Sequence, residues 1–264
     1  MRLVMIGTGT GVPTAERRPS GVAMEQDGHH LLLDSGSGTI GGLARAGLDY
    51  RSIGMALYTH AHTDHTLDLA ALVHALNFTP GYAHRAALRV IGPAGFKGFV
   101  ERLFAAYPSL AEREYPVEVE ELDGGEVDLG WGRLISAPVP HSDAPANAYR
   151  FETADGVAVF SGDCSPSPRL PELARGADLL VCEASFPAPV PEAKNHLTTA
   201  DAARIAAQAE VKTLVLTHFY PRAHAEDVEA ECARCFSGKV IPAWDGLVLE
   251  LRARNVDVLG DCGA

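Results

Sequence analysis

The chain has 264 residues, 47% of them hydrophobic and 21% charged, so it is long enough to bury a core without disulfide staples. Its five cysteines are an odd number at irregular spacing, which fits a reduced, cytoplasmic protein better than a disulfide framework. A formal net charge of −12 argues against a large nucleic-acid footprint, and no run approaches the roughly 20 apolar residues of a membrane span.

The N-terminal third is predicted to contain short strands separated by glycine-rich turns. An apolar pattern with breaks at glycine, proline and aspartate predicts strands at 1–6, 21–26, 30–34 and 55–59, and a short helix at 40–46. From Asp64 onward the apolar residues recur at helical spacing. A helix is therefore expected directly after the fourth strand.

The rest of the chain alternates between predicted strands and helices. Strands are expected at 87–91, 116–121, 133–139, 147–152, 157–161, 178–182, 213–217, 239–241 and 246–251. Helices are expected at 94–106, 198–209 and 225–235. No repeat or long linker divides the sequence, so residues 1–264 are expected to form one α/β domain with two packed sheets and helices outside them.

A dense group of metal-binding side chains follows the strand expected at 55–59. The stretch is THAHTDH (59–65), and it contains His60, His62, Asp64 and His65. Imidazole and carboxylate groups are ligands for zinc and other divalent cations. Two residues that are two positions apart at a strand end point the same way, whereas residues at the turn into a helix can aim elsewhere. One loop can therefore supply ligands to two adjacent ions.

Four residues are too few to hold two ions, and further candidate ligands stand after later strands. Each follows a β-like run directly, and they are His141, Asp163 and His218. Loops at strand ends are where rigid scaffolds carry their active sites. Taken singly, each of these residues could be a structural histidine or a turn-forming aspartate. Together with the first motif they predict a single dinuclear centre.

These residues resemble the signature of the metallo-β-lactamase superfamily, and the closer resemblance is to its ribonuclease Z-like branch and the small phosphodiesterases related to it. Four further stretches carry the branch resemblance: GTGTGVPTAERRPSG (7–21), LLLDSGSGT (31–39), SGDCSPS (161–167) and CEASF…NHLTTADAARIA…LVLTHFYPR (182–222). The resemblance implies a four-layer αββα sandwich with a dinuclear site, usually zinc, at one edge of the two sheets.

The resemblance also implies how the ligands divide between two ions. The expected arrangement is His60, His62 and His141 on one ion, Asp64, His65 and His218 on the other, and Asp163 bridging the two. Residue types at these positions are compatible with this division.

Two residues are implied to act in catalysis, and two more to support the site. Asp64 is expected to orient the nucleophile, and His196 to act on the transition state or the leaving group. Glu183 matches a family glutamate and is expected to orient a site histidine. Asp34 is expected either as a buried support behind the metal loop or as a turn-forming residue.

The chemistry that such a site favours is hydrolysis. Two divalent ions about 3.5–4 Å apart can hold a bridging hydroxide at neutral pH and neutralise the charge that develops on a phosphodiester. We therefore predict a metal-dependent hydrolase, foremost a phosphodiesterase acting on small cyclic-nucleotide or aryl phosphodiesters. Zinc is the expected metal, and manganese or iron(II) would suit the same ligands. The alternatives are lactonase, arylsulfatase or β-lactamase chemistry, and a metal-binding protein without catalysis.

The interval between His141 and Asp163 bears on the substrate. Ribonuclease Z enzymes carry there a long arm that grips tRNA, whereas only residues 142–162 intervene here, enough for one β-hairpin. tRNA 3′ processing is therefore the alternative to a small substrate. A homodimer is expected from the resemblance, and no membrane partner is expected.

Overall fold

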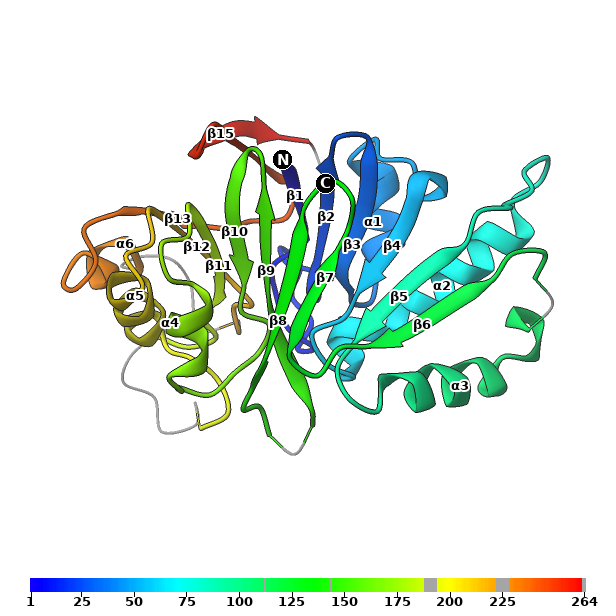
Figure 1. Cartoon of the computed structure of the whole chain (residues 1–264), viewed down its shortest axis with the longest axis horizontal. Coiled ribbons are helices and arrows are strands. Elements are labelled where there is room, and N and C mark those ends of the chain that lie inside the picture. Colours follow the sequence, from blue (N-terminus) through cyan, green and yellow to red (C-terminus); the bar gives the residue numbers. More distant parts are fainter. Residues whose placement is uncertain (112, 143, 188–193, 222–227, 263–264) are drawn as a thin grey trace.

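The computed structural model describes residues 1–111, 113–142, 144–187, 194–221 and 228–262, which form two β-sheets packed face to face (Figure 1). Within these ranges the first sheet has the strand order β15-β14-β1-β2-β3-β4-β5-β6. Its strands are β1 Arg2–Gly7, β2 Gly21–Gln26, β3 His29–Ser35, β4 Ile53–Leu57, β5 Leu88–Gly92, β6 Val117–Glu121, β14 Leu247–Arg252 and β15 Asn255–Asp261.

The second sheet has the strand order β13-β12-β11-β10-β9-β8-β7. Its strands are β7 Gly125–Asp128, β8 Arg133–Val139, β9 Ala146–Thr153, β10 Gly156–Phe160, β11 Leu179–Glu183, β12 Thr213–Thr217 and β13 Lys239–Pro242. Strands β10 to β13 run parallel to one another, as do strands β3 to β6 in the first sheet. The carboxyl ends of the parallel strands therefore share one edge of each sheet, where α/β proteins place their ligands.

Helices cover the outer face of each sheet (Figure 1). The first sheet is flanked by α1 Thr39–Arg45, α2 Thr63–Phe78 and α3 Phe96–Ala106, and the second by α4 Arg169–Leu173, α5 Thr199–Gln208 and α6 Val228–Cys232. Two short 3-10 helices are η1 Tyr50–Ser52 and η2 Pro108–Leu110. None of the helices that the structure describes is long and apolar enough to cross a membrane.

Three layers of apolar side chains hold this arrangement together. Between the sheets, Leu33 of the first sheet belongs to the same buried cluster as Phe151 and Val215 of the second. A second cluster joins the outer face of the first sheet to α2, and a third joins the second sheet to α5. Because each sheet buries both faces, helix, sheet, sheet and helix form four layers. The predicted αββα sandwich is confirmed.

The helices and strands agree with the sequence predictions except at some of their boundaries and in a few short or edge elements. The strand expected at 55–59 ends at Leu57, because the backbone N–H of Thr59 donates to the Asp34 carboxylate instead of to a neighbouring strand. Besides the two 3-10 helices, three described elements were not predicted, namely β7, β15 and α4. In β7 most side chains are exposed and Val127 is the one apolar residue, and α4 is only five residues long. In β15 most side chains are also exposed, although Val256 and Val258 alternate with polar residues and offered a strand signal. Of the helix expected at 225–235, residues 225–227 lie outside the described part of the chain.

Candidate metal centre

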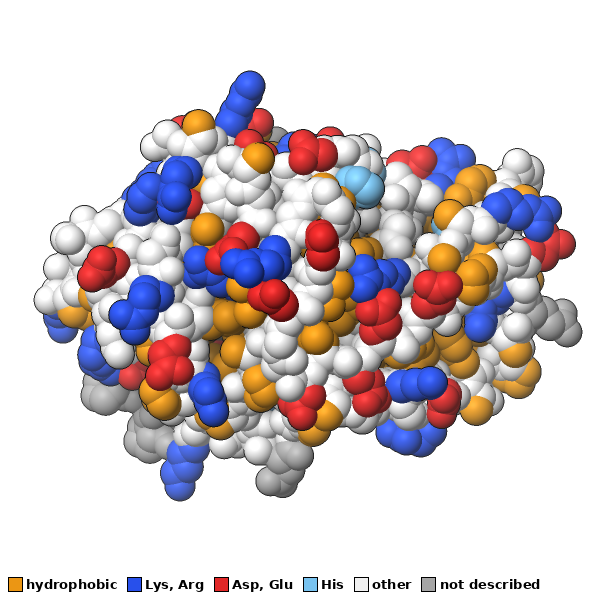
Figure 2. Space-filling model, viewed as in Figure 1, with side chains coloured by type: hydrophobic (Ala, Val, Ile, Leu, Met, Phe, Trp, Pro, Cys, Tyr) orange, Lys and Arg blue, Asp and Glu red, His pale blue; other side chains and the backbone are white. Residues whose placement is uncertain are grey.

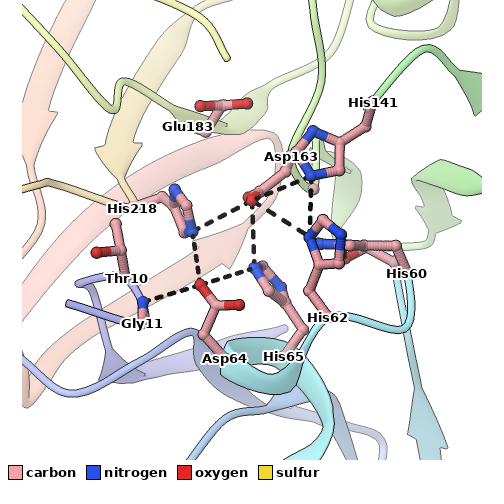
Figure 3. A network of polar contacts seen from close by, with 12 residues as sticks. Thr10, Gly11, His60, His62, Asp64, His65, His141, Asp163, Glu183 and His218 are labelled. Atoms are coloured by element: carbon pink, nitrogen blue, oxygen red, sulfur yellow. Dashed lines mark hydrogen bonds and ion pairs between the residues drawn. The ribbon is translucent and has the colours of Figure 1, made fainter. Parts of the chain in front are cut away.

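All seven predicted ligands meet at the edge where the parallel strands end (Figure 3). The loop after β4 and the first turn of α2 contribute His60, His62, Asp64 and His65. The loops after β8, β10 and β12 contribute His141, Asp163 and His218. Both sheets therefore supply side chains to one cluster.

Among the described residues, five groups of three side chains bring possible ligand atoms within 4.8 Å of one another. One of them joins His60 and His65 through Asp163, two include His196, and the remaining two contain only predicted ligands and share no residue. One group is His60, His62 and His141, and the other is Asp64, His65 and His218. Asp163 lies between the two groups (Figure 3). Its Oδ2 is 3.3 Å from His218 Nε2, 3.4 Å from His65 Nε2 and 3.9 Å from His60 Nε2. These groups coincide with the division between two ions that the resemblance implies.

The spacing of these atoms fits a shared cation better than direct hydrogen bonds. Most of the separations from Asp163 Oδ2 exceed the 2.7–3.2 Å that is usual for an N–H···O bond. Two ligands about 2.0–2.2 Å from a tetrahedral zinc ion are themselves about 3.3–3.5 Å apart. The Nε2 atoms of His60, His65 and His218 are buried and have no hydrogen-bond partner among the described residues. Cations held by the two groups would satisfy all three nitrogens.

The opposite nitrogens of two of these histidines are fixed by a buried carboxylate and a hydroxyl. Asp34 accepts hydrogen bonds from the Thr59 backbone N–H at 2.8 Å, from Thr59 Oγ1 at 2.9 Å and from His65 Nδ1 at 2.8 Å. Because the single hydroxyl proton of Thr59 goes to Asp34, His60 Nδ1 must donate to Thr59 Oγ1, at 3.0 Å. The lone pair of each Nε2 then faces the centre, as metal binding requires. Asp34 is thus a buried support, not merely a turn residue.

Two further histidines are held in the same tautomer from the second sheet. His141 Nδ1 donates to the carbonyl oxygen of Asn195 at 2.9 Å. Ser185 donates its hydroxyl proton to Glu183 Oε2 at 2.6 Å, so His218 Nδ1 must donate to Ser185 Oγ, at 2.9 Å. Each of these imidazoles therefore also presents Nε2 as an acceptor toward the centre.

The charges at the centre suit a cation. Burial lowers the pKa of His60 and of His141, which keeps both imidazoles neutral. Burial alone would raise the pKa of Asp163, but His218 and His65 outweigh it and hold that carboxyl ionised. Burial would likewise lower the pKa of His65, but Asp163 and Asp34 outweigh it and raise that pKa. A cation would therefore displace a proton at His65.

The glycine-rich loop at 7–11 supports the same group of ligands. The backbone N–H of Gly11 donates to Asp64 Oδ2 at 2.9 Å (Figure 3). A short parallel bridge joins Gly9 to Phe219, the residue after His218. The loop is therefore a turn that packs beneath the site.

His196 borders the centre and is oriented by Glu183. The His196 Nδ1 atom lies 3.1 Å from Glu183 Oε2 and 3.8 Å from Asp163 Oδ2. Burial would lower the pKa of His196, but the bond to Glu183 and its charge outweigh burial and raise that pKa. Glu183 Oε1 accepts from the backbone N–H of Cys164 at 2.6 Å, next to Asp163. The glutamate therefore links His196, through Ser185, to His218 and to the loop that carries Asp163.

Several residues that shape the site were missed in the sequence. They are Thr59, Ser185, Asn195 and the aromatic pair Phe186 and Tyr220. The signal for Ser185 was available, since a residue two positions after Glu183 in extended backbone points to the same side. Asn195 acts through its backbone carbonyl, which no side-chain motif can reveal.

Comparisons with known proteins agree with this geometry. The family described as Beta-lactamase superfamily domain matches residues 29–219. A ribonuclease Z from Thermobifida fusca is 30% identical over 312 aligned positions, which cover 96% of this chain and 95% of that protein. Because those positions outnumber the 264 residues of this chain, the relative carries insertions that this chain lacks.

Solved structures show the same fold. The metallo-β-lactamase fold protein YhfI from Bacillus subtilis superimposes with a TM-score of 0.81 at 23% identity, covering 94% of this chain and 98% of that one. A diphosphatase from the PhnP family gives a TM-score of 0.75 at 24% identity, covering 94% of this chain and 97% of that one. The chain therefore belongs to the metallo-β-lactamase superfamily and, within it, to the ribonuclease Z-like group.

Proposed function

We propose that this hydrolytic enzyme is a phosphodiesterase that uses two divalent metal ions, foremost zinc, and acts on small cyclic-nucleotide or aryl phosphodiesters. The observation that carries the proposal is His196, which Glu183 holds beside Asp163 at the edge of the ligand cluster. A site that only stored metal would have no need of an oriented, proton-bearing imidazole outside the ligand set.

The seven clustered residues would hold the metals, with Asp163 shared between them. When bound, two divalent ions supply a hydroxide nucleophile at neutral pH and neutralise charge on the phosphoryl oxygens. Asp64 would orient the attacking water, since the Gly11 N–H fixes its carboxylate. Burial would raise the pKa of Asp64, but the close approach of His218, whose Nε2 lies 3.5 Å from Asp64 Oδ2, and the charge of His65 outweigh burial and hold that pKa low, so the carboxylate stays an acceptor.

His196 would donate a proton to the departing oxygen. Its Nδ1 is engaged by Glu183, so Nε2 is the nitrogen left to face a substrate. Because the pKa of His196 is raised, the imidazolium persists to higher pH than that of an ordinary histidine. A positioned acid of this kind contributes roughly 10²–10⁴-fold to such reactions.

Three observations support a small substrate. Between His141 and Asp163 the described residues form only the β9–β10 hairpin. Figure 2 shows acidic and basic side chains interspersed on the face it displays, without a continuous basic tract. The net charge is −12. A phosphate-rich polymer needs clustered cationic side chains, which neither the composition nor this face supplies.

Processing of tRNA is the second candidate, because the similar proteins are named ribonuclease Z. A PhnP-family neighbour is named a diphosphatase, which favours a smaller phosphoryl compound. We also propose, from the resemblance alone, that the enzyme is a homodimer. The molar mass measured by light scattering after size-exclusion chromatography tests this.

The test is hydrolysis of bis(p-nitrophenyl) phosphate by chelator-treated protein, before and after addition of zinc, manganese or iron(II). Activity should require added metal and should be kept in His74→Ala, whose side chain is exposed on α2. In His196→Ala it should fall, and it should fall further on diphenyl phosphate, whose leaving group is more basic. A lactone, a sulfate ester, a β-lactam and a precursor tRNA are compared in parallel. Faster turnover of any of these by orders of magnitude would overturn the proposed substrate class, and fewer than one metal ion per chain at saturation would overturn the dinuclear site.

A further inference from the structure

Two aromatic rings stand at the rim of the centre without a role in the site described so far. Phe186 follows β11, and Tyr220 follows β12 two residues after His218. Their rings are stacked, with centroids 4.6 Å apart and planes at 15°. Both side chains are only partly buried, and neither belongs to an apolar core cluster. We call this pair the aromatic wall.

The aromatic wall borders His196, the residue proposed to protonate the leaving group. The Tyr220 ring centroid is 5.9 Å from that of His196 and 6.3 Å from that of His218, with both pairs close to perpendicular. The Phe186 ring centroid is 6.3 Å from that of His196. A group bonded to the oxygen that His196 protonates would therefore lie within reach of these rings.

Backbone bonds hold the aromatic wall in place. The Tyr220 backbone N–H donates to the Ser185 carbonyl at 3.3 Å, and the Thr199 backbone N–H donates to the Phe186 carbonyl at 3.0 Å. Thr199 begins α5, whose N-terminus is fixed by a capping box between Thr198 and Asp201. Rings that are fixed beforehand lose little entropy when a ligand stacks on them.

We propose that the aromatic wall contacts a planar aromatic group carried by the leaving alcohol, so that the enzyme prefers aryl over alkyl leaving groups of equal acidity. This inference rests on the proposed function, because the leaving-group side is defined by His196. Aromatic rings present π-faces and edges that attract another ring in stacked or edge-to-face contact. Stacking of this kind is worth about tenfold or more in binding.

The first experiment compares two phosphodiesters whose leaving groups are a phenol and a fluoroalkyl alcohol of matched acidity. The wild-type protein should favour the aryl ester in kcat/KM, and Tyr220→Ala should reduce that preference by about tenfold. Tyr220→Phe keeps the ring and should keep the preference. Tyr107→Ala, which removes an exposed tyrosine at the end of α3, is the matched control and should leave the aryl preference in kcat/KM unchanged. Equal losses on both esters in Tyr220→Ala would overturn the proposal.

A binding measurement makes the test independent of turnover. Phenylphosphonate and methylphosphonate share a metal-binding oxyanion and differ in one ring, so calorimetry on zinc-loaded protein gives their ratio of Kd. The ratio should fall about tenfold in Tyr220→Ala and in Phe186→Ala, the second variant in case the first fails to fold. An altered ratio without phosphodiester hydrolysis would keep the aromatic wall and reject the proposed function. An unchanged ratio in a folded, zinc-loaded variant would reject the aromatic wall even if hydrolysis is observed.

Discussion

Replacing Glu183 with glutamine tests whether that carboxylate sets the protonation of His196. The change removes a buried negative charge 3.1 Å from His196 Nδ1 while keeping the size of the side chain. Glutamine can still accept from the Cys164 N–H, but its amide nitrogen would then face His196 and Ser185 as a donor. The variant therefore alters both the charge and the direction of the hydrogen bond.

The size of the effect follows from the geometry. An opposite charge within about 4–6 Å raises the pKa of a histidine by roughly 1–3 units. At an effective dielectric constant of about 20, a pair 4 Å apart interacts by about 4 kcal/mol, which corresponds to the upper end of that range. Since Glu183 favours the imidazolium, its loss lowers the pKa of His196 and leaves less acid at a given pH. The alkaline limb of the rate profile should therefore move to lower pH.

The assay is the pH dependence of kcat and kcat/KM for two diesters that differ in leaving group. Diphenyl phosphate releases a basic phenolate and needs the acid, whereas bis(p-nitrophenyl) phosphate releases a stable anion and needs it less. Above the lowered pKa, Glu183→Gln should lose about tenfold or more on diphenyl phosphate and less on the nitrophenyl ester. Glu172→Gln on α4, an exposed glutamate, is the matched control.

Metal content must be measured in the same samples, because Glu183 also supports His218 through Ser185. A fully metallated Glu183→Gln protein with an unmoved alkaline limb and equal losses on both esters would refute the assignment of His196 as the proton donor. A variant that merely lost metal would lose both activities together and regain them at saturating zinc.

Three further changes probe the supports of the centre. Asp34→Asn removes the acceptor of His65 Nδ1 and should weaken zinc binding about 10–100-fold in chelator competition, and a change below twofold would contradict the role of Asp34 as a support. Zinc at about 100 times its Kd should stabilise the protein by about 2.7 kcal/mol, a rise in Tm of about 5–10 °C by scanning fluorimetry that chelation reverses, and an unchanged Tm would argue against a site formed on folding. Gly36→Ala would place a Cβ 2.1 Å from the Asp64 carbonyl oxygen and should lower the free energy of unfolding by at least about 1–3 kcal/mol in urea, whereas Gly54→Ala, with open space around it, should not.

The ligand positions were predictable because they follow strands directly. His141, Asp163 and His218 each come after a buried run, and parallel strands bring such positions to one edge. Histidine and aspartate at such positions are recognisable both by their ability to bind metal and by their place after a strand. The sequence therefore predicted which side chains meet, and the structure brings all of them together.

The residues that hold the candidate ligands in place were less predictable, because their contacts join parts of the chain that are far apart in the sequence. The Tyr149 hydroxyl donates to the Tyr58 carbonyl at 2.8 Å across 91 positions, and the Asn147 N–H donates to the Thr59 carbonyl at 2.8 Å. These bonds tie β9 of the second sheet to the metal loop of the first. Periodicity within one element carries no information about a partner in the other sheet.

Asp34 and His218 adopt left-handed backbone conformations, and hydrogen bonds of their side chains offset the cost. Asp34 has a φ of 56° and His218 a φ of 60°, a region that costs residues other than glycine roughly 1–3 kcal/mol each. Asp34 offsets this cost with three buried hydrogen bonds, and His218 with its bond to Ser185. His218 Nε2 nevertheless stays buried without a partner among the described residues, and so do the corresponding atoms of His60 and His65. Because a buried unsatisfied nitrogen costs about 1–3 kcal/mol, cations that engage these nitrogens in the two groups would stabilise the fold as well as complete the site. Metal binding and stability should therefore change together.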